Sequence, residues 1–358
     1  MKISKISFLQ GQRVIYTLLA ALVAASICVT LKTPLPWLLG PLLVTATLSI
    51  FGVKTLSWTP LRNSAQWTIG AALGLYFTPQ VNSVVISLWW AILFSVIWAL
   101  LLGLIYEFWL HWFNAPRLPY LDRTTTFFSS LIGAAPEMTL LAERENARTD
   151  LVASAHSLRI LIVAVTVPFI VQWFGWHDLD SIPDQTQRFD AKGFIGLALV
   201  TSLGVWGVKR LGQSNSWFLG PLAASIALAS CEVTLSHIPT WLTNLSQLVI
   251  GVSLGVRFTS EFTQGAPRWL ISVAIGTLTM IALSCLASYV LCSSTSLPLP
   301  TIILATAPGG IAEMAITAKV LHLGVAVVTA IQACRVIAIL VLADPLYKLL
   351  KHRLTIYS

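Results

Sequence analysis

Long apolar stretches separated by short polar loops run the whole length of the chain. The longer stretches reach the roughly 20 residues that a helix needs to cross the hydrocarbon core of a membrane. They lie at residues 14–31, 35–51, 61–77, 81–113, 124–142 and 151–174, and then at 194–208, 217–230, 241–258, 269–291, 301–321 and 326–350. This pattern predicts an all-α integral membrane protein.

The two sets of segments share residue types at a nearly constant offset, which indicates an internal duplication. The matched residues are Trp37, Leu39, Gly40, Pro41 and Leu42 with Trp217, Leu219, Gly220, Pro221 and Leu222, then Gln66, Gly70 and Gly74 with Gln247, Gly251 and Gly255, and finally Gly133, Glu137, Met138 and Arg159 with Gly309, Glu313, Met314 and Arg335. We therefore expect a first membrane repeat at residues 1–176, a polar linker at 177–191 and a second membrane repeat at 192–358.

The orientation of the two repeats depends on how many times each one crosses the membrane. Six full crossings in each would place the acidic linker in the cytoplasm and Lys209 with Arg210 outside, against the positive-inside rule. Five crossings and one re-entrant or interfacial segment would reverse this and give inverted repeats, a common plan among secondary transporters. We favour the inverted arrangement, and the parallel arrangement stays open.

The amino-acid composition also indicates a chain that is embedded in a lipid bilayer. Hydrophobic residues make up 56% and charged residues 10%, with a mean hydropathy of +0.80, whereas an ordinary soluble domain is about one quarter charged. The net charge of +8 comes from Lys and Arg scattered over loops and ends. Because no basic face is formed, we expect a lipid bilayer and a small solute or ion as partners, and no direct binding of nucleic acid.

Basic residues near both ends predict that both termini face the cytoplasm. These residues are Lys2, Lys5 and Arg13 at the amino end and Lys348, Lys351 and Arg353 at the carboxyl end. The chain would then cross the membrane an even number of times. Assembly into a homo-oligomer is compatible with the sequence but is not predicted by it.

A Pro-Gly-Gly run interrupts the apolar segment at residues 301–321. Pro308, Gly309 and Gly310 remove a backbone donor and weaken helical propensity, so they predict a broken helix at membrane depth. Glu313 follows one turn later, either as an acid that caps its own helix or as a cation or proton site. In the first half the corresponding acid, Glu137, directly follows Pro136, so the two positions are not equivalent.

An arginine with a hydrogen-bonding neighbour three residues earlier recurs in both halves. His156 precedes Arg159, and Gln332 precedes Arg335. Positions i and i+3 share one helix face, and an intramembrane arginine needs a partner. The sequence allows internal ion pairs, Arg159 with Glu137 and Arg335 with Glu313, or capture of an anionic solute by the guanidinium groups, and the two roles are compatible.

The remaining polar and small residues carry weaker signals. Gln66 and Gln247 are intramembrane amides that either line a path or bond between helices. The matched Leu-Gly-Pro-Leu runs at 39–42 and 219–222 favour close helix packing with a kink. The sequence lacks a nucleophile elbow, a phosphate loop and a zinc-protease motif, and its histidines and cysteines are dispersed. We therefore expect no enzyme activity, no cofactor and no metal.

The Trp-Leu-Leu-Gly-Pro run at Trp37, the Ala-Thr-Ala-Pro-Gly-Gly-Ile-Ala-Glu-Met run from Ala305 and the helix around Arg335 resemble the AbrB family of bacterial inner-membrane proteins. The resemblance covers nearly the whole chain. It implies a duplicated, multi-pass protein of the bacterial inner membrane, described variously as a regulator of gene expression, a transport-like protein or an ammonia monooxygenase. The first half departs from the family's Pro-Gly-Gly pattern at Ile132 and Ala134, and the dispersed histidines argue against the monooxygenase.

These observations lead to one main functional hypothesis and one rival. The main hypothesis is a secondary transporter or exporter of a small polar or anionic solute, with a site between the repeats. Its residues would be Gln66, Glu137, His156, Arg159, Gln247, Pro308, Gly309, Gly310, Glu313, Gln332 and Arg335. The rival is a membrane-bound regulator of gene expression that acts through a partner or through a solute that it senses.

Overall fold

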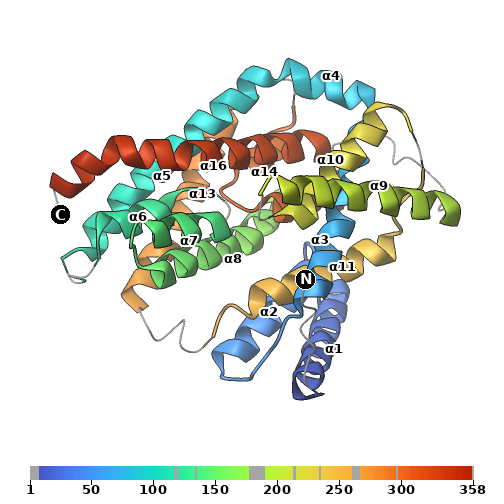
Figure 1. The fold of residues 1–358 in the computed structure, drawn as a ribbon, viewed down its shortest axis with the longest axis horizontal. Helices are drawn as coiled ribbons and strands as arrows, with labels where there is room; N and C mark the ends of the chain where they lie inside the picture. Colours follow the sequence, from blue (N-terminus) through green and yellow to red (C-terminus); the bar gives the residue numbers. More distant parts are fainter. Residues whose placement is uncertain are drawn as a thin grey trace. The chain divides into compact units, whose positions relative to one another are not determined.

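The chain is entirely helical in its described part, as the apolar pattern predicts (Figure 1). The computed structural model describes residues 8–116, 118, 121–133, 135–176, 190–212, 215–233, 235–259, 267–295 and 297–356. These residues form 15 helices and contain no strand. The predicted linker at 177–191 lies outside the described residues except for Asp190 and Ala191, and so do Lys2 and Lys5.

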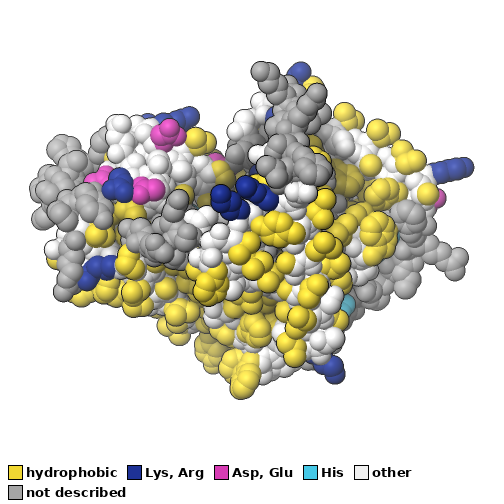
Figure 2. All heavy atoms as spheres, turned by 90° about the horizontal axis from the view of Figure 1, so that it is seen from below, with side chains coloured by type: hydrophobic (Ala, Val, Ile, Leu, Met, Phe, Trp, Pro, Cys, Tyr) yellow, Lys and Arg dark blue, Asp and Glu magenta, His cyan; other side chains and the backbone are white. Residues whose placement is uncertain are grey.

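Six of the described helices are long and apolar enough to cross a membrane, by length and composition. They are α1 (Phe8–Thr30), α5 (Trp89–Asn114), α8 (Thr149–Trp173), α9 (Ala191–Arg210), α13 (Pro267–Cys292) and α16 (Val325–Ile356). Large hydrophobic side chains on these helices are exposed. Figure 2 shows hydrophobic side chains over much of one face, with groups of Lys, Arg, Asp and Glu side chains mostly near its edges. These features indicate a multi-pass membrane protein.

The helices gather into two compact units, and each unit combines segments from both predicted halves. The first unit contains Met1–Pro79 and Pro183–Gly265, and the second contains Gln80–Ile182 and Ala266–Ser358. The first unit therefore holds α1, α2 (Pro36–Ile50), α3 (Thr59–Gly74), α9, α10 (Ser216–Ser230) and α11 (Thr240–Gly255). In it α2 packs on α1 and α11, and α10 packs on α9 and α3.

Close approach of helix backbones holds the first unit together. A Cβ atom added to Gly70 on α3 would lie 2.3 Å from the carbonyl oxygen of Phe218 on α10, and one added to Gly251 on α11 would lie 2.5 Å from that of Leu38 on α2. Because lipid is as apolar as the side chains, the hydrophobic effect contributes little to helix association in a membrane. Contacts between small residues bring the helices close enough for favourable van der Waals packing. Gly40 and Gly220 of the Leu-Gly-Pro-Leu runs also lie against neighbouring backbone, as the close-packing interpretation predicts.

The second unit is built around a core of aromatic and aliphatic side chains. It contains α5 and α8, then the short pairs α6 (Arg123–Ser130) with α7 (Ala135–Arg144) and α14 (Leu299–Thr306) with α15 (Ile311–Val320), and finally α13 and α16. Phe127 and Phe128 of α6 pack against Tyr347 of α16, with ring centroids 5.5 and 5.0 Å apart. This aromatic contact joins a short helix from the first half to a long helix from the second half.

Three of the predicted apolar segments are each divided in the structure. The predicted broken helix at 301–321 is observed as α14 and α15, and the corresponding segment at 124–142 as α6 and α7. The apolar run at 81–113 is also divided, into α4 (Pro79–Ser87) and α5, with Leu88 between them at φ −90° and ψ 17°. That division was not predicted, because the run contains no proline and its one glycine, Gly103, lies well inside α5, so no such residue marks a helix end at Leu88.

We expect Gly251→Ala to destabilise the protein by about 1–3 kcal/mol, the usual effect of overpacking a close contact. The added methyl group would meet the backbone of α2, which has no side-chain freedom with which to move away. Thermal unfolding of the detergent-purified protein measures the effect. Gly207→Ala on α9 is the matched control, because a Cβ atom there meets nothing within 4 Å. Equal melting temperatures for the two variants would contradict the packing assignment.

Candidate functional site

The two helix breaks of the second unit have similar backbone conformations. Helix α6 ends before Leu131, at φ −60° and ψ 136°, and α14 ends before Ala307, at φ −53° and ψ 139°. Each extended residue turns the chain away before the last turn of carbonyl groups can accept helical hydrogen bonds. Those carbonyl oxygens need other partners, because an unsatisfied carbonyl group in the hydrocarbon region of a membrane is costly.

Arg335 supplies those partners at the second-half break. Its side chain is 0% exposed. Nη1 donates to the carbonyl oxygen of Ala307 at 2.6 Å, and Nη2 donates to that of Gly309 at 2.8 Å. Gln332 completes the arrangement: its Oε1 accepts from Arg335 Nη2 at 2.6 Å, and its Nε2 donates to the carbonyl oxygen of Leu304 at 2.7 Å. The positive guanidinium therefore sits at the negative carboxyl end of α14.

Arg159 plays the same part at the first-half break. Its Nη2 donates to the carbonyl oxygen of Leu131 at 3.0 Å, while Nη1 lies 3.3 Å from that of Ser130. His156 takes the place of Gln332: its Nδ1 accepts from Arg159 Nη2 at 2.8 Å, and its Nε2 lies 2.9 Å from the carbonyl oxygen of Phe128. Since Nδ1 accepts, the ring is the neutral tautomer that donates from Nε2.

Each break also touches the arginine helix of the other half. A Cβ atom added to Gly309 would lie 2.9 Å from Cγ1 of Val163 on α8, and one added to Gly133 would lie 3.3 Å from Cγ2 of Ile339 on α16. Both contacts fall one turn after the arginine of the helix concerned. Each break is therefore held by the arginine of its own half and packed against the arginine helix of the other half.

Acidic residues mark the amino ends of the second short helices. Glu313 is the third residue of α15 and is 9% exposed, while Glu137 is the third residue of α7 and is half-buried. A Cβ atom added to Gly310 would lie 2.0 Å from Oε2 of Glu313, so this carboxylate folds back over the residue that caps α15. That position is the one taken by the acid of a capping box, where it complements the positive end of the helix.

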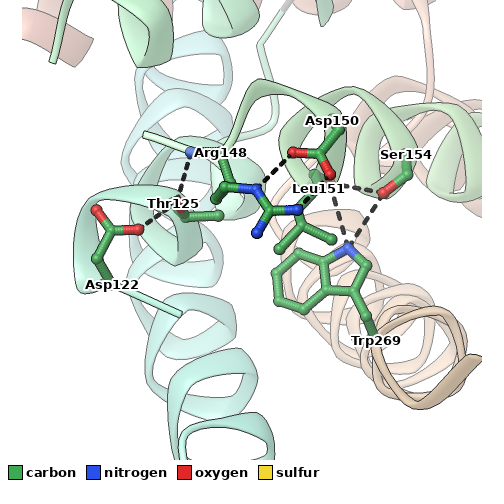
Figure 3. A network of polar contacts seen from close by, with 7 residues as sticks. All are labelled: Asp122, Thr125, Arg148, Asp150, Leu151, Ser154 and Trp269. Atoms are coloured by element: carbon green, nitrogen blue, oxygen red, sulfur yellow. Dashed lines mark hydrogen bonds and ion pairs between the residues drawn. The ribbon is translucent and has the colours of Figure 1, made fainter. Parts of the chain in front are cut away.

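A polar network fixes the start of α8, the helix that carries His156 and Arg159 (Figure 3). The backbone N–H of Arg148 donates to Oγ1 of Thr125 on α6 at 2.9 Å, and the Thr125 hydroxyl donates to Asp122. Nε1 of Trp269 on α13 donates to the carbonyl oxygen of Leu151 and to Oγ of Ser154, both at 3.2 Å. The first turn of α8 is thereby tied to both α6 and α13.

Comparison with known proteins assigns the chain to a family. The model of the family described as "Transition state regulatory protein AbrB" matches residues 37–351, which include both breaks and both arginines. This chain belongs to the AbrB family.

Two curated relatives of this AbrB-family protein match along most of their length. A Bacillus subtilis (strain 168) protein named "Uncharacterized protein YhjN" is 26% identical over 343 residues, covering 88% of this chain and 87% of the relative. An Escherichia coli (strain K12) protein named "Putative regulator AbrB" is 22% identical over 310 residues, covering 86% of this chain and 87% of the relative. The family resemblance predicted from the sequence is confirmed.

The structure brings most of the predicted site residues of this AbrB-family chain into two groups. Pro308, Gly309, Gly310, Glu313, Gln332 and Arg335 lie at the second-half break, and Glu137, His156 and Arg159 lie at the first-half break. Gln66 on α3 and Gln247 on α11 belong to the other unit and are not part of either group.

The arginines have partners that sequence reasoning missed. In the described part of the chain their hydrogen bonds go to backbone carbonyls, His156 and Gln332, and neither Glu137 nor Glu313 is among these partners. The sequence does contain one regularity that relates each arginine to its break. Arg159 follows Leu131 by 28 residues, and Arg335 follows Ala307 by the same 28 residues. Among the described residues, no three His, Cys, Asp or Glu side chains are placed to hold a metal ion.

We expect Arg335→Gln to destabilise the AbrB-family protein by about 3 kcal/mol, because the Ala307 and Gly309 carbonyls would lose charged donors in a buried place. Thermal unfolding in detergent measures this loss. Arg148→Gln is the control: its ion pair with Asp150 is exposed, and such pairs contribute about 1 kcal/mol or less. A melting temperature for Arg335→Gln as high as that of the control would refute the assigned role of the guanidinium.

Proposed function

We propose that this chain is a secondary transporter or exporter of a small polar or anionic solute, located in the bacterial inner membrane. The observation that carries the proposal is the pair of broken helices whose carboxyl ends are held by fully buried arginines. Irregular backbone at membrane depth is tolerated where protein or a water-filled cavity satisfies it, and in transporters such breaks form the solute and ion sites.

The distribution of charge around the breaks supports the proposal. Arg159 and Arg335 place positive charge at the two carboxyl ends, and Glu137 and Glu313 stand in the first turns that follow. Part of each guanidinium is already used on carbonyl oxygens, so the arginines both hold the breaks and contribute a positive field that attracts an anionic group. Glu313 is then the group that we assign to a coupling cation or proton, because it is a buried acid beside the break.

We further propose that the two halves are duplicated and inverted in the membrane. Helix lengths match in pairs: 15 residues for α2 and α10, 16 for α3 and α11, 26 for α5 and α13, 8 for α6 and α14, and 10 for α7 and α15. The arginine-to-carbonyl spacing also matches. Inverted repeats with broken helices at a site near the membrane midplane are a common plan among secondary transporters. Both termini would then be cytoplasmic.

A second candidate function is a membrane-bound regulator of gene expression. It is favoured by the name of the Escherichia coli relative, "Putative regulator AbrB". In this reading the chain would act through a partner or through the solute that it senses or moves, without enzyme activity and without contacting nucleic acid itself. Transport and regulation are compatible, because a transporter changes the concentration of a solute that another protein reads.

The experiment that tests transport begins with a thermal-stability screen of the purified protein against small anions and polar metabolites. A ligand at 100 times its dissociation constant stabilises the folded state by about 2.7 kcal/mol. Hits are then tested for uptake into proteoliposomes. A folded protein that responds to no ligand and moves no solute would favour the regulator.

We expect Glu313→Gln to lower that uptake at least tenfold, which corresponds to about 1.4 kcal/mol in the barrier. The glutamine keeps a side chain that can cap α15 but removes the charge that the coupling ion would meet. Glu143→Gln on α7 is the matched control, since Glu143 is exposed. If uptake by Glu313→Gln equals that of the control, while both variants stay folded, the coupling role of Glu313 is wrong.

A further inference from the structure

Four buried hydroxyl side chains lie on α5, α13 and α14, three helices that share a core cluster through Ala91, Leu291 and Ile302. They are Ser95 on α5, Ser284 and Ser288 on α13 and Thr306 at the end of α14, and none is more than 3% exposed. We call them the hydroxyl cluster. Thr306 directly precedes Ala307, whose carbonyl oxygen accepts from Arg335, so the cluster borders the second-half break.

Two members of the hydroxyl cluster are bonded to each other and to their helices. Ser288 Oγ donates to the carbonyl oxygen of Ser284 at 2.7 Å and lies 2.7 Å from Thr306 Oγ1. Thr306 Oγ1 donates to the carbonyl oxygen of Ile302 at 3.0 Å. Their hydrogens are thus largely committed, and what these two oxygens still offer is lone pairs.

The other two members, Ser95 and Ser284, are each 2% exposed, and their hydroxyl oxygens have no hydrogen-bond partner among the described residues. Helix hydroxyls commonly donate to the carbonyl oxygen one turn earlier, as Ser26 and Ser246 do here. Ser95 and Ser284 do not use this option. A buried hydroxyl left without a partner costs about 1–3 kcal/mol, so two of them in one place need an explanation.

The packing of α5 on α13 brings these two hydroxyls to the same level. Tyr106 OH donates to the carbonyl oxygen of Val273, and Arg268 donates to that of Phe113, so residue numbers rise along α5 as they fall along α13. Ser95 stands 11 residues before Tyr106, and Ser284 stands 11 residues after Val273. The helices are still together beyond this level, where Ala91 and Leu291 share a core cluster.

We propose that the hydroxyl cluster is a binding site for a neutral hydroxyl group, supplied by water or by a hydroxylated solute. Ser95 and Ser284 would donate to the ligand oxygen, and Ser288 and Thr306 would accept from its hydrogen. A charged ligand fits poorly, because the cluster contains no ionic side chain. The carboxyl end of α14 repels an anion and Arg335 repels a cation. The site goes beyond the proposed transport and would exist whether or not the chain moves a solute.

The test compares the melting temperature of detergent-purified wild type with that of Ser95→Ala/Ser284→Ala. If a ligand hydroxyl is held, the double variant melts lower, because it loses two donors to that ligand. If the hydroxyls bind nothing, removing two unsatisfied groups leaves the melting temperature unchanged or raises it, and the proposal is overturned. Ser246→Ala is the control, a buried serine already bonded to its own helix. The single variants carry the same test if the double variant is not folded.

Addition of erythritol, a four-carbon polyol, separates the two sources of the hydroxyl group. As an excluded osmolyte it raises all melting temperatures by a common amount. An additional rise in wild type and Ser246→Ala that is absent from Ser95→Ala/Ser284→Ala identifies a solute hydroxyl. Equal rises in all three proteins, together with the lower melting temperature of the double variant, identify water.

Discussion

The buried contact between an arginine and the carbonyl end of a broken helix is the interaction on which the second unit depends. A helix that stops within an apolar region leaves carbonyl groups without the partners that the next helical turn would supply. Arg159 and Arg335 donate hydrogen bonds to these carbonyl oxygens, and charged donors form stronger hydrogen bonds than neutral ones. Because each guanidinium reaches its break from a separate long helix, the same contact positions α8 against α6 and α16 against α14.

The helices within the first unit and those within the second unit are packed by different kinds of contact. In the first unit, glycine lets helix backbones meet directly, with Gly70 and Gly251 in equivalent contacts. In the second unit, the helices are connected by packing of the aromatic side chains of Phe127, Phe128 and Tyr347 and by the hydrogen bonds of the buried arginines. Contacts between small residues provide close helix packing alone. Buried polar contacts also place charged groups inside the protein, where such groups are often functional.

The two breaks resemble each other in hydrogen bonding but differ in their surroundings. His156 and Gln332 support their arginines in the same way, one with a ring and one with an amide. Glu313 is buried and folds over a glycine, while Glu137 is half-buried and follows a proline. The second-half break alone is bordered by the hydroxyl cluster. The two breaks are therefore not equivalent, which agrees with an AbrB-family chain whose first half departs from Pro-Gly-Gly.

The sequence by itself determined the features that depend on short stretches of chain. Apolar runs predicted the long helices, and Pro308, Gly309 and Gly310 predicted a break, because proline and glycine act on the backbone where they stand. The matched residues also singled out both arginines and both glutamates. Membership of the AbrB family followed from motifs that remain visible in the chain.

Only the tertiary structure decided which groups meet. The sequence allowed carboxylate partners or an anionic solute for Arg159 and Arg335. Besides His156 and Gln332, the observed partners are backbone carbonyls, which every residue has and which no pattern can single out. Gln66 and Gln247 are matched like the site residues, yet they belong to the other compact unit. Ser95 and Ser284 are far apart in the chain and are brought to the same level only by the packing of α5 on α13. Local propensity chooses the helices, whereas contacts between distant segments depend on how whole helices pack.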